Sequence, residues 1–367
     1  MGKILHLERK FISPTETFIY NQIQNLEDFD VLIATVKPTN GIENDFTVLR
    51  PKGSRWVNTN ILLSPVKNDL IQQLNDYEIS LIHTHYLTDA SFFYPLTKTM
   101  KCPKICSVYG YDVSEFPQKY GGLGKLYLQR VFRSYDKIIA MSPDMKKDLL
   151  KVSCPEDKII VHYYGTDVSR YTSIQRDYNL RNGILRLLTV ASLRDKKGHT
   201  TVLKALALVK DRMKFHYDIV GEGPLHSELE QLTKILGIEE WVKFHGHVEY
   251  KDNVSLYSQA DVFILTSEIA KSGDKEGIPG VIVEGMASAL PIVSTYHAGI
   301  PFIIQNNISG LLAEEKDSAK VAEYILQLYQ DKELREKIGT KARDATLNNL
   351  NLHIRSRELV KIYNQLL

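Results

Sequence analysis

The chain has 367 residues, of which 43% are hydrophobic and 25% are charged. This composition is typical of a globular protein, and the length predicts two domains that each bury a core. Lys and Arg number 46 against 44 Asp and Glu, which leaves a net charge of +2. The balance excludes a strongly basic nucleic-acid-binding protein, so nucleic acid is not an expected partner.

Three cysteines are too few for a disulfide framework and are typical of a reducing compartment. No apolar run approaches the roughly 18 residues that a membrane-spanning helix needs. The first residues lack the pattern of a signal peptide or of a myristoylation site. We therefore expect a cytoplasmic protein without a membrane-spanning segment.

Short apolar runs alternate with helix-like segments along the whole chain. In the first half we predict strands over 3–7, 31–36, 79–85, 104–109 and 137–141, with a helix over 16–26. In the second half we predict strands over 185–191, 215–220, 242–245, 262–265 and 291–294. The helices predicted there span 199–210, 225–236, 281–288 and 319–329.

Such alternation is typical of βαβ units around a parallel sheet. We predict an α/β protein with two doubly wound, Rossmann-like domains, over residues 1–180 and 181–349, that face a central cleft. The polar stretch 176–183 is the best candidate for the linker between them. A C-terminal helix over 350–367 is expected to pack back on the N-terminal domain.

The densest group of glycine and polar residues runs from Gly273 to Pro291. A glycine-rich loop that enters a helix offers free backbone N–H groups and the positive end of a dipole, which suit a phosphate or sugar hydroxyls. Glu284 stands in an apolar stretch of this segment. Because a buried, unpaired carboxylate is costly, we favour a ligand role for Glu284, such as binding a ribose diol, over a solvated surface position.

A second group of polar residues follows a predicted strand and contains Arg194, Lys196 and Lys197. These cations are expected at the mouth of the cleft. One cation at about 4 Å from a phosphate gains about 4 kcal/mol at an effective dielectric constant near 20. A plain surface turn has the same residues, so this segment alone is weak evidence.

Together these segments resemble the retaining glycosyltransferases of family 4, which have the GT-B architecture. Glu276 and Glu284 match the E-x(7)-E signature of that family, and Lys197-Gly198 matches its donor-phosphate Lys-Gly. Segments 220–225, 243–246 and 258–267 match its framework. The N-terminal half resembles the exopolysaccharide and colanic-acid branch more loosely, at 13–18, 82–85, 110–114 and 165–167.

The resemblance implies a retaining, metal-independent transfer of sugar from a nucleoside-diphosphate sugar to a glycan or lipid-linked acceptor in surface polysaccharide synthesis. No cofactor is expected. The catalytic residues implied are His85 and Glu276. The donor-binding residues implied are Ser192, Arg194, Lys197, Phe244, His245, Gly277, Ile278, Pro279 and Glu284, and those on the acceptor side are Ser13, Thr15 and Asp112.

Three positions depart from the family pattern. Ser192 stands where the family usually has Arg, Tyr109 where it often has His, and Phe302 where it has Glu. These departures leave open a non-catalytic GT-B subunit that binds nucleotides. A GT-B nucleotide-sugar epimerase or phosphorylase is the other alternative.

Residues 124–134 form a basic amphipathic pattern in which Lys125, Arg130 and Arg133 accompany apolar residues, with Lys119 just before them. This pattern predicts either a core helix with a solvated face or an interfacial helix on anionic lipid, where each basic residue adds about 1 kcal/mol.

His83 and His85 alternate on a predicted strand and so point the same way. A metal pair there lacks carboxylate or thiol partners in the sequence, so we expect no metal site.

Overall fold

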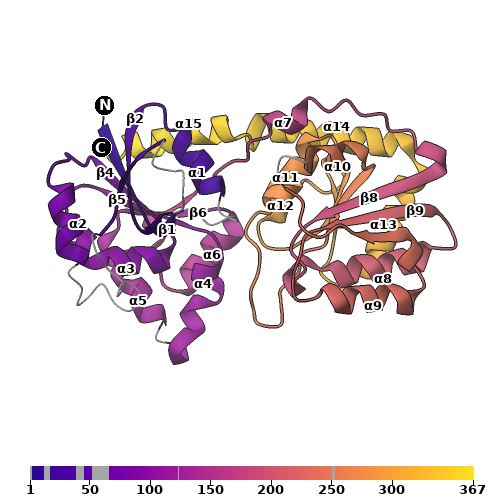
Figure 1. The fold of residues 1–367 in the computed structure, drawn as a ribbon, viewed down its shortest axis with the longest axis horizontal. Helices are drawn as coiled ribbons and strands as arrows, with labels where there is room; N and C mark the ends of the chain where they lie inside the picture. Colours follow the sequence, from indigo (N-terminus) through magenta and orange to yellow (C-terminus); the bar gives the residue numbers. More distant parts are fainter. Residues whose placement is uncertain (1, 12–16, 39–44, 52–65, 123, 250–252) are drawn as a thin grey trace. The chain divides into compact units, whose positions relative to one another are not determined.

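The computed structural model describes residues 2–11, 17–38, 45–51, 66–122, 124–249 and 253–367. The chain forms two compact units (Figure 1). The first unit comprises Met1–Gly165 and Leu352–Leu367, and the second comprises Thr166–Asn351. The structural boundary therefore precedes the predicted one at residue 180, and the last helix of the chain belongs to the first unit.

The first unit is built on a seven-stranded sheet with the order β3-β2-β1-β4-β5-β6-β7, in which every pair is parallel. Its strands are β1 (Gly2–Phe11), β2 (Phe29–Pro38), β3 (Thr47–Leu49), β4 (Leu81–His85), β5 (Lys104–Val108), β6 (Lys137–Ala140) and β7 (Ile159–Val161). Its helices are α1 (Thr17–Gln24), α2 (Val66–Leu74), α3 (Leu87–Thr97), α4 (Tyr111–Ser114), α5 (Gly124–Ser134), α6 (Pro143–Lys151) and α15 (Leu352–Asn364).

Alternation along the strands divides this sheet into two faces. On one face, Leu5, Leu32 and Ile82 pack against α2 and α3. On the other face, the register pairs His6 with His83 on neighbouring strands. Figure 1 shows α2, α3 and α5 on one side of the sheet and α1 and α15 on the other. The histidine-bearing face is thus the one that α15 covers.

The second unit contains a six-stranded sheet with the order β10-β9-β8-β11-β12-β13, again with parallel pairs. Its strands are β8 (Ile184–Val190), β9 (Lys214–Val220), β10 (Val242–Phe244), β11 (Val262–Leu265), β12 (Ile292–Thr295) and β13 (Leu311–Ala313). Its helices are α7 (Ser169–Thr172), α8 (His199–Val209), α9 (His226–Leu236), α10 (Asn253–Gln259), α11 (Gly280–Ala287), α12 (Ile300–Ile303), α13 (Ser318–Gln330) and α14 (Lys332–Asn349).

Apolar side chains from β8, β9 and β11 join those of α8, α9 and α13 in the largest core of this unit. Figure 1 shows these three helices on one face of the sheet and α10 and α11 on the other. The strand order reverses direction between β8 and β11. In doubly wound sheets, ligands bind beyond the carboxyl ends of the strands at this switch point.

The α/β class and the two doubly wound parallel sheets are confirmed. Each predicted strand and helix corresponds to one in the structure, and the amphipathic segment 124–134 coincides with α5. Patterning misses the strands β3, β7 and β13, each of which has only three residues, although it finds β10, which is equally short.

Arg176, in the segment predicted as a linker, is hydrogen-bonded inside the second unit. Its guanidinium donates to the backbone carbonyl oxygens of Tyr257, Ala260 and Ser288. Burial lowers the pKa of Arg176 to about 10, so the group stays charged at neutral pH. The segment is therefore anchored to the second unit at this residue.

Replacing Arg176 with Leu leaves three carbonyl groups without their donor and should lower the free energy of unfolding by about 3 kcal/mol. Urea denaturation measures this change. The matched control, Arg181→Leu, lies at an exposed position and should stay within about 0.5 kcal/mol of wild type. Equal stabilities of the two variants would contradict the anchoring role.

Candidate functional site

Two loops leave the sheet of the second unit from adjacent strands at its switch point. The loop after β8 runs to Gly198, and the loop after β11 runs to Pro279. Gly198 has a φ of 67°, and a Cβ there would lie 1.8 Å from the carbonyl oxygen of Thr266. Only glycine allows this approach, which brings the two loops into contact.

Four charged side chains meet where these loops touch. The Lys197 Nζ lies 3.0 Å from the Glu276 Oε1, and the Lys196 Nζ lies 3.4 Å from the same oxygen. Lys196 also pairs with the Asp274 Oδ2 at 3.0 Å. The structure thus joins three residues that the sequence singled out, Lys196, Lys197 and Glu276, and adds Asp274 to them.

The two lysines set the charge state of Glu276. Its side chain is only 12% exposed, and burial by itself raises the pKa of a carboxyl group. Lys197 and Lys196 outweigh burial and hold the pKa of Glu276 below its ordinary value. Glu276 is consequently an ionised carboxylate in a largely dry site.

The predicted residues Gly277, Ile278 and Pro279 lie between Glu276 and the first turn of α11. The first N–H groups of a helix have no partner within the helix and carry partial positive charge. The α11 terminus ends the loop after β11, and the two lysines reach the same loop from the loop after β8, so positive charge gathers around Glu276. Such an arrangement suits an anionic ligand.

Glu284, the second carboxylate of the motif, is buried in α11 rather than exposed to solvent. The Tyr257 hydroxyl donates to its Oε2 at 2.9 Å. Burial raises the pKa of Glu284, and the hydrogen bond from Tyr257 opposes that rise. Tyr257, on α10, is a supporting residue that sequence reasoning missed because it belongs to no motif.

The predicted donor residues at the end of β10 lie beside β9. The His245 Nε2 is 2.5 Å from the Asp218 Oδ1, and His216 is 3.2 Å from the same oxygen. Phe244 packs edge to face on His226, with ring centroids 5.3 Å apart. These side chains form a group separate from the charged cluster at Lys197, at the end of neighbouring strands of the same sheet.

Three positions raised by the sequence lie outside the charged cluster. Ser192 accepts a hydrogen bond from His199 through its carbonyl oxygen, 3.1 Å away. Arg194 is exposed, and Phe302, on α12, is 42% exposed.

His297 and Glu315 are further residues of this region that sequence reasoning missed. The backbone N–H of Glu276 donates to the His297 Nε2 at 3.1 Å, and the His297 Nδ1 lies 2.6 Å from the Glu315 Oε1. His297 is fully buried. A histidine two residues after β12, a strand that the sequence predicted, was the only signal that could have indicated it.

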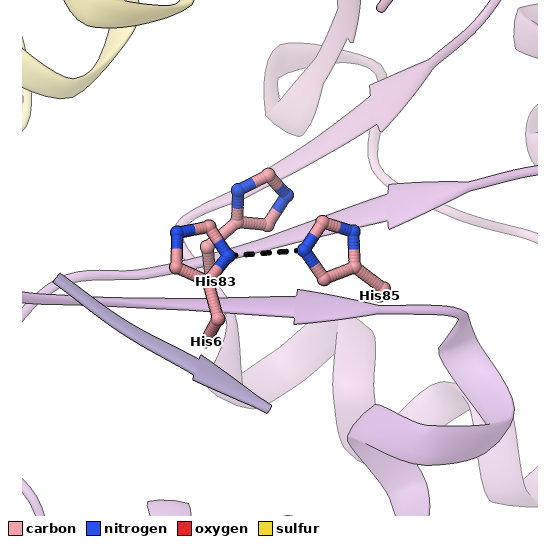
Figure 2. A group of neighbouring side chains, drawn as sticks. All are labelled: His6, His83 and His85. Atoms are coloured by element: carbon pink, nitrogen blue, oxygen red, sulfur yellow. Dashed lines mark hydrogen bonds between the residues drawn. The ribbon is translucent and has the colours of Figure 1, made fainter. Parts of the chain in front are cut away.

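In the first unit, His6, His83 and His85 form a buried cluster on the face that α15 covers. Figure 2 shows the three imidazole rings side by side. The His6 Nδ1 and the His85 Nε2 are 3.0 Å apart. The other nitrogen of His85 bonds the Tyr109 hydroxyl at 2.7 Å.

The rest of this cluster is also hydrogen-bonded. His83 contacts the Tyr363 hydroxyl of α15 at 2.5 Å and the Ser107 hydroxyl at 2.7 Å. Of the six ring nitrogens, only the His6 Nε2 has no partner among the described residues. One ring nitrogen from each of the three histidines lies within 4.8 Å of the other two, an arrangement that could hold a metal ion.

Burial keeps these imidazoles neutral. It lowers the pKa of His6 to about 3 and lowers the pKa values of His83 and His85 well below their ordinary range. His85, predicted as catalytic, is therefore fully buried with both nitrogens bonded to protein. Tyr109, the departure from the family pattern, is one of its two partners.

Asp112, predicted on the acceptor side, is fully buried beside the same strand end. Its Oδ2 accepts a hydrogen bond from the Tyr109 N–H at 3.4 Å. Burial raises the pKa of Asp112 to about 7. The other two acceptor-side residues, Ser13 and Thr15, lie outside the described residues.

Among the helices in the described part of the chain, none has the length and apolar character required to cross a membrane.

Two family models match consecutive parts of the chain. Residues 15–170 match glycosyltransferase family 4, and residues 171–345 match glycosyl transferases group 1. The amylovoran biosynthesis glycosyltransferase AmsK of Erwinia amylovora is 33% identical over 238 residues, which are 65% of this chain and 58% of AmsK. A protein of Escherichia coli K12 named for colanic acid biosynthesis, WcaL, is 31% identical over 65% of this chain and 59% of its own length. The chain thus spans about three fifths of these relatives.

Solved structures confirm the GT-B fold. A glycosyltransferase from Rickettsia africae superposes with a TM-score of 0.82 at 20% identity, covering 100% of this chain and 98% of the other. The HepE protein of Anabaena, in complex with UDP, superposes with a TM-score of 0.81 at 18% identity over 100% of both chains.

The buried histidines predict a loss of stability in acid. Below pH 6.5 the unfolded chain protonates its histidines, whereas folded His6 stays neutral down to a pH of about 3. The unfolded state then binds more protons, so the free energy of unfolding falls as the pH falls through this window. His6→Asn should reduce the slope of the free energy of unfolding against pH by about 1.4 kcal/mol per pH unit.

Urea denaturation between about pH 4.5 and 6 measures this slope. Asp112, whose pKa is raised, makes the free energy of unfolding change with pH in the opposite direction. This contribution is the same in wild type and in His6→Asn, so it does not affect their difference. The control His247→Asn changes a side chain that is 70% exposed and should leave the slope unchanged. A His6→Asn slope equal to that of wild type would show that His6 is not held neutral.

Proposed function

The chain belongs to glycosyltransferase family 4, and we propose that it transfers a sugar from a nucleoside-diphosphate sugar to a glycan or lipid-linked acceptor in exopolysaccharide synthesis. The relatives named for amylovoran and colanic acid biosynthesis support the polysaccharide context. The observation that carries the proposal is the pairing of Lys197 with Glu276 beside the N-terminus of α11. This combination offers positive charge for a diphosphate and a carboxylate for sugar hydroxyls.

The proposal gives each group a role in the second unit. Lys197 binds the departing diphosphate, and Glu276 and the amides that follow it bind the donor sugar. Glu284 binds the ribose in exchange for its hydrogen bond with Tyr257. Phe244 and His245 lie against the nucleobase, while Ser192 and Arg194 border the donor from the loop after β8.

In the first unit, the proposal places the acceptor near the end of β4. His85 remains the proposed catalytic residue there, with Asp112, Ser13 and Thr15 on the acceptor side. Because His85 already bonds His6 and Tyr109, it must exchange one of these partners to touch a substrate.

We propose that the reaction retains the anomeric configuration and proceeds without a metal. Two lysines and a helix N-terminus supply positive charge where the diphosphate accumulates negative charge. Glu276 is held by these lysines as their counterion, which disfavours its attack on the sugar. A same-face reaction follows, in which the acceptor hydroxyl attacks the anomeric carbon as the bond to the diphosphate breaks, and the hydroxyl proton passes to the departing diphosphate. NMR of the product anomer tests this outcome.

Glu276→Gln and Lys197→Met should each lower the transfer rate by about 100-fold or more, since each removes a charge that acts in the transition state. A panel of nucleotide sugars with polysaccharide-repeat acceptors, followed by mass detection of the product, provides the assay. The matched controls Glu240→Gln and Lys204→Met change exposed residues of the same unit and should retain wild-type rates.

The same assay separates the alternatives. A product formed from donor without acceptor indicates an epimerase, and a product that needs inorganic phosphate indicates a phosphorylase. Nucleoside-diphosphate binding by calorimetry without any turnover indicates a non-catalytic subunit. Wild-type rates in Glu276→Gln or Lys197→Met would refute the role assigned to that residue.

We also propose that α5 binds the anionic inner face of the cell membrane, where a lipid-linked acceptor is presented. Leu128, Val131 and Phe132 are buried, whereas Leu126 and Tyr127 are 62% and 46% exposed. The exposed side also carries Lys125, Arg130 and Arg133. Apolar side chains flanked by cations are complementary to an anionic lipid surface.

Arg130→Gln together with Arg133→Gln should weaken binding to phosphatidylglycerol vesicles by about 30-fold, at about 1 kcal/mol for each charge. Vesicle flotation at low salt measures the bound fraction. The control pair Lys234→Gln and Lys271→Gln removes two exposed charges elsewhere and should bind as wild type does. Failure of the wild-type protein to float would reject the membrane proposal.

A further inference from the structure

The loop that carries Glu276 is tied to the rest of the second unit at both ends. We define the donor loop as residues 268–276. At its start, the Ile269 N–H donates to the Glu315 Oε2 at 2.9 Å. At its end, the Glu276 N–H donates to the His297 Nε2 at 3.1 Å. The remaining oxygen of Glu315 meets the remaining nitrogen of His297 at 2.6 Å.

These contacts assign one tautomer to His297. Its Nε2 accepts from a backbone N–H, so that nitrogen carries no proton. The proton of the neutral ring must then lie on Nδ1, where it is donated to the Glu315 carboxylate. Glu315, His297 and the Glu276 amide thus form one hydrogen-bonded chain with a fixed direction.

The middle of the donor loop has little else to hold it. Ile269 is 49% exposed, and Lys271, Ser272 and Gly273 are exposed. The loop therefore does not belong to the apolar core, and polar contacts determine its position. Its other polar contacts with the unit include the Glu268 N–H, which donates to the backbone carbonyl oxygen of Lys196 at 3.0 Å. They also include the ion pairs of Lys196 with Asp274 and of Lys197 with Glu276.

We propose that His297 and Glu315 are a positioning pair that sets the placement of Glu276 for catalysis. This inference rests on the proposed function. His297 accepts a hydrogen bond from the backbone N–H of Glu276 and so fixes the backbone from which the carboxylate projects toward Lys197. Glu315 accepts hydrogen bonds from the Ile269 N–H and from the His297 Nδ1–H, and so links both ends of the loop.

The pair acts at a distance from the reacting atoms, so its loss should affect turnover more than binding. His297→Leu and Glu315→Leu should lower kcat by about 10- to 100-fold, as expected for a catalytic group displaced by about 1 Å. The KM for the donor should change by less than about threefold, because Lys197 is untouched.

His297→Gln is the conservative variant, since its side-chain carbonyl oxygen can accept from the Glu276 N–H in place of Nε2. It should recover most of the kcat lost in His297→Leu. Glu314→Leu changes the exposed neighbour of Glu315 and serves as the matched control, with wild-type kinetics expected. Equal losses in His297→Gln and His297→Leu, or a loss confined to KM, would overturn the positioning role.

A spectroscopic measurement tests the pair without any turnover. In the nitrogen-15 spectrum of the wild-type protein, His297 should show a protonated Nδ1 and an unprotonated Nε2. Amide exchange in residues 269–276 should quicken in His297→Leu and Glu315→Leu but not in Glu314→Leu. A protonated Nε2, or unchanged exchange, would overturn the inference.

These measurements distinguish the two proposals. If the wild-type protein transfers no sugar, the proposed function fails, while the tautomer and the exchange rates still report on the pair. If the wild-type protein is active but the variants keep their kcat, the positioning role fails and the proposed function stands.

Discussion

The ion pair between Lys197 and Glu276 is the contact on which the site of the second unit depends. It forms because β8 and β11 are neighbours in a parallel sheet, so the loops that follow them leave from the same edge. Gly198 lets the two loops touch at Thr266, where a side chain would collide with the backbone. Removing Glu276 would leave the largely buried ammonium group of Lys197 uncompensated, which is strongly destabilising.

Positive and negative charges balance in this cluster, with Lys196 and Lys197 facing Asp274 and Glu276. On the proposed function, an incoming diphosphate competes with Glu276 for Lys197, since both offer anionic oxygens to one ammonium group. Lys196 retains contact with both carboxylates during this exchange. The second lysine thus keeps Glu276 ionised when the first one turns to the ligand.

The polar cluster of the first unit consists of buried, neutral imidazoles, whereas that of the second unit consists of ion pairs. His6, His83 and His85 are neutral, and the hydroxyl groups of Ser107, Tyr109 and Tyr363 hydrogen-bond to His83 and His85. This arrangement also accounts for one departure from the family pattern. Tyr109 supplies the hydrogen-bonding group next to His85, so the position keeps a polar partner in place of the more usual histidine.

The sequence alone is sufficient to predict the α/β class, the two sheets and the segments that carry Lys197, Glu276 and Glu284. Strand and helix periods are local properties, and a glycine-rich motif keeps its residues together along the chain. Partners that are distant in the chain leave no such local signal. Only the tertiary structure joins His297 and Glu315 to Glu276, Tyr257 to Glu284, and Tyr363 to His83, because strand order and helix packing bring these side chains within hydrogen-bonding distance.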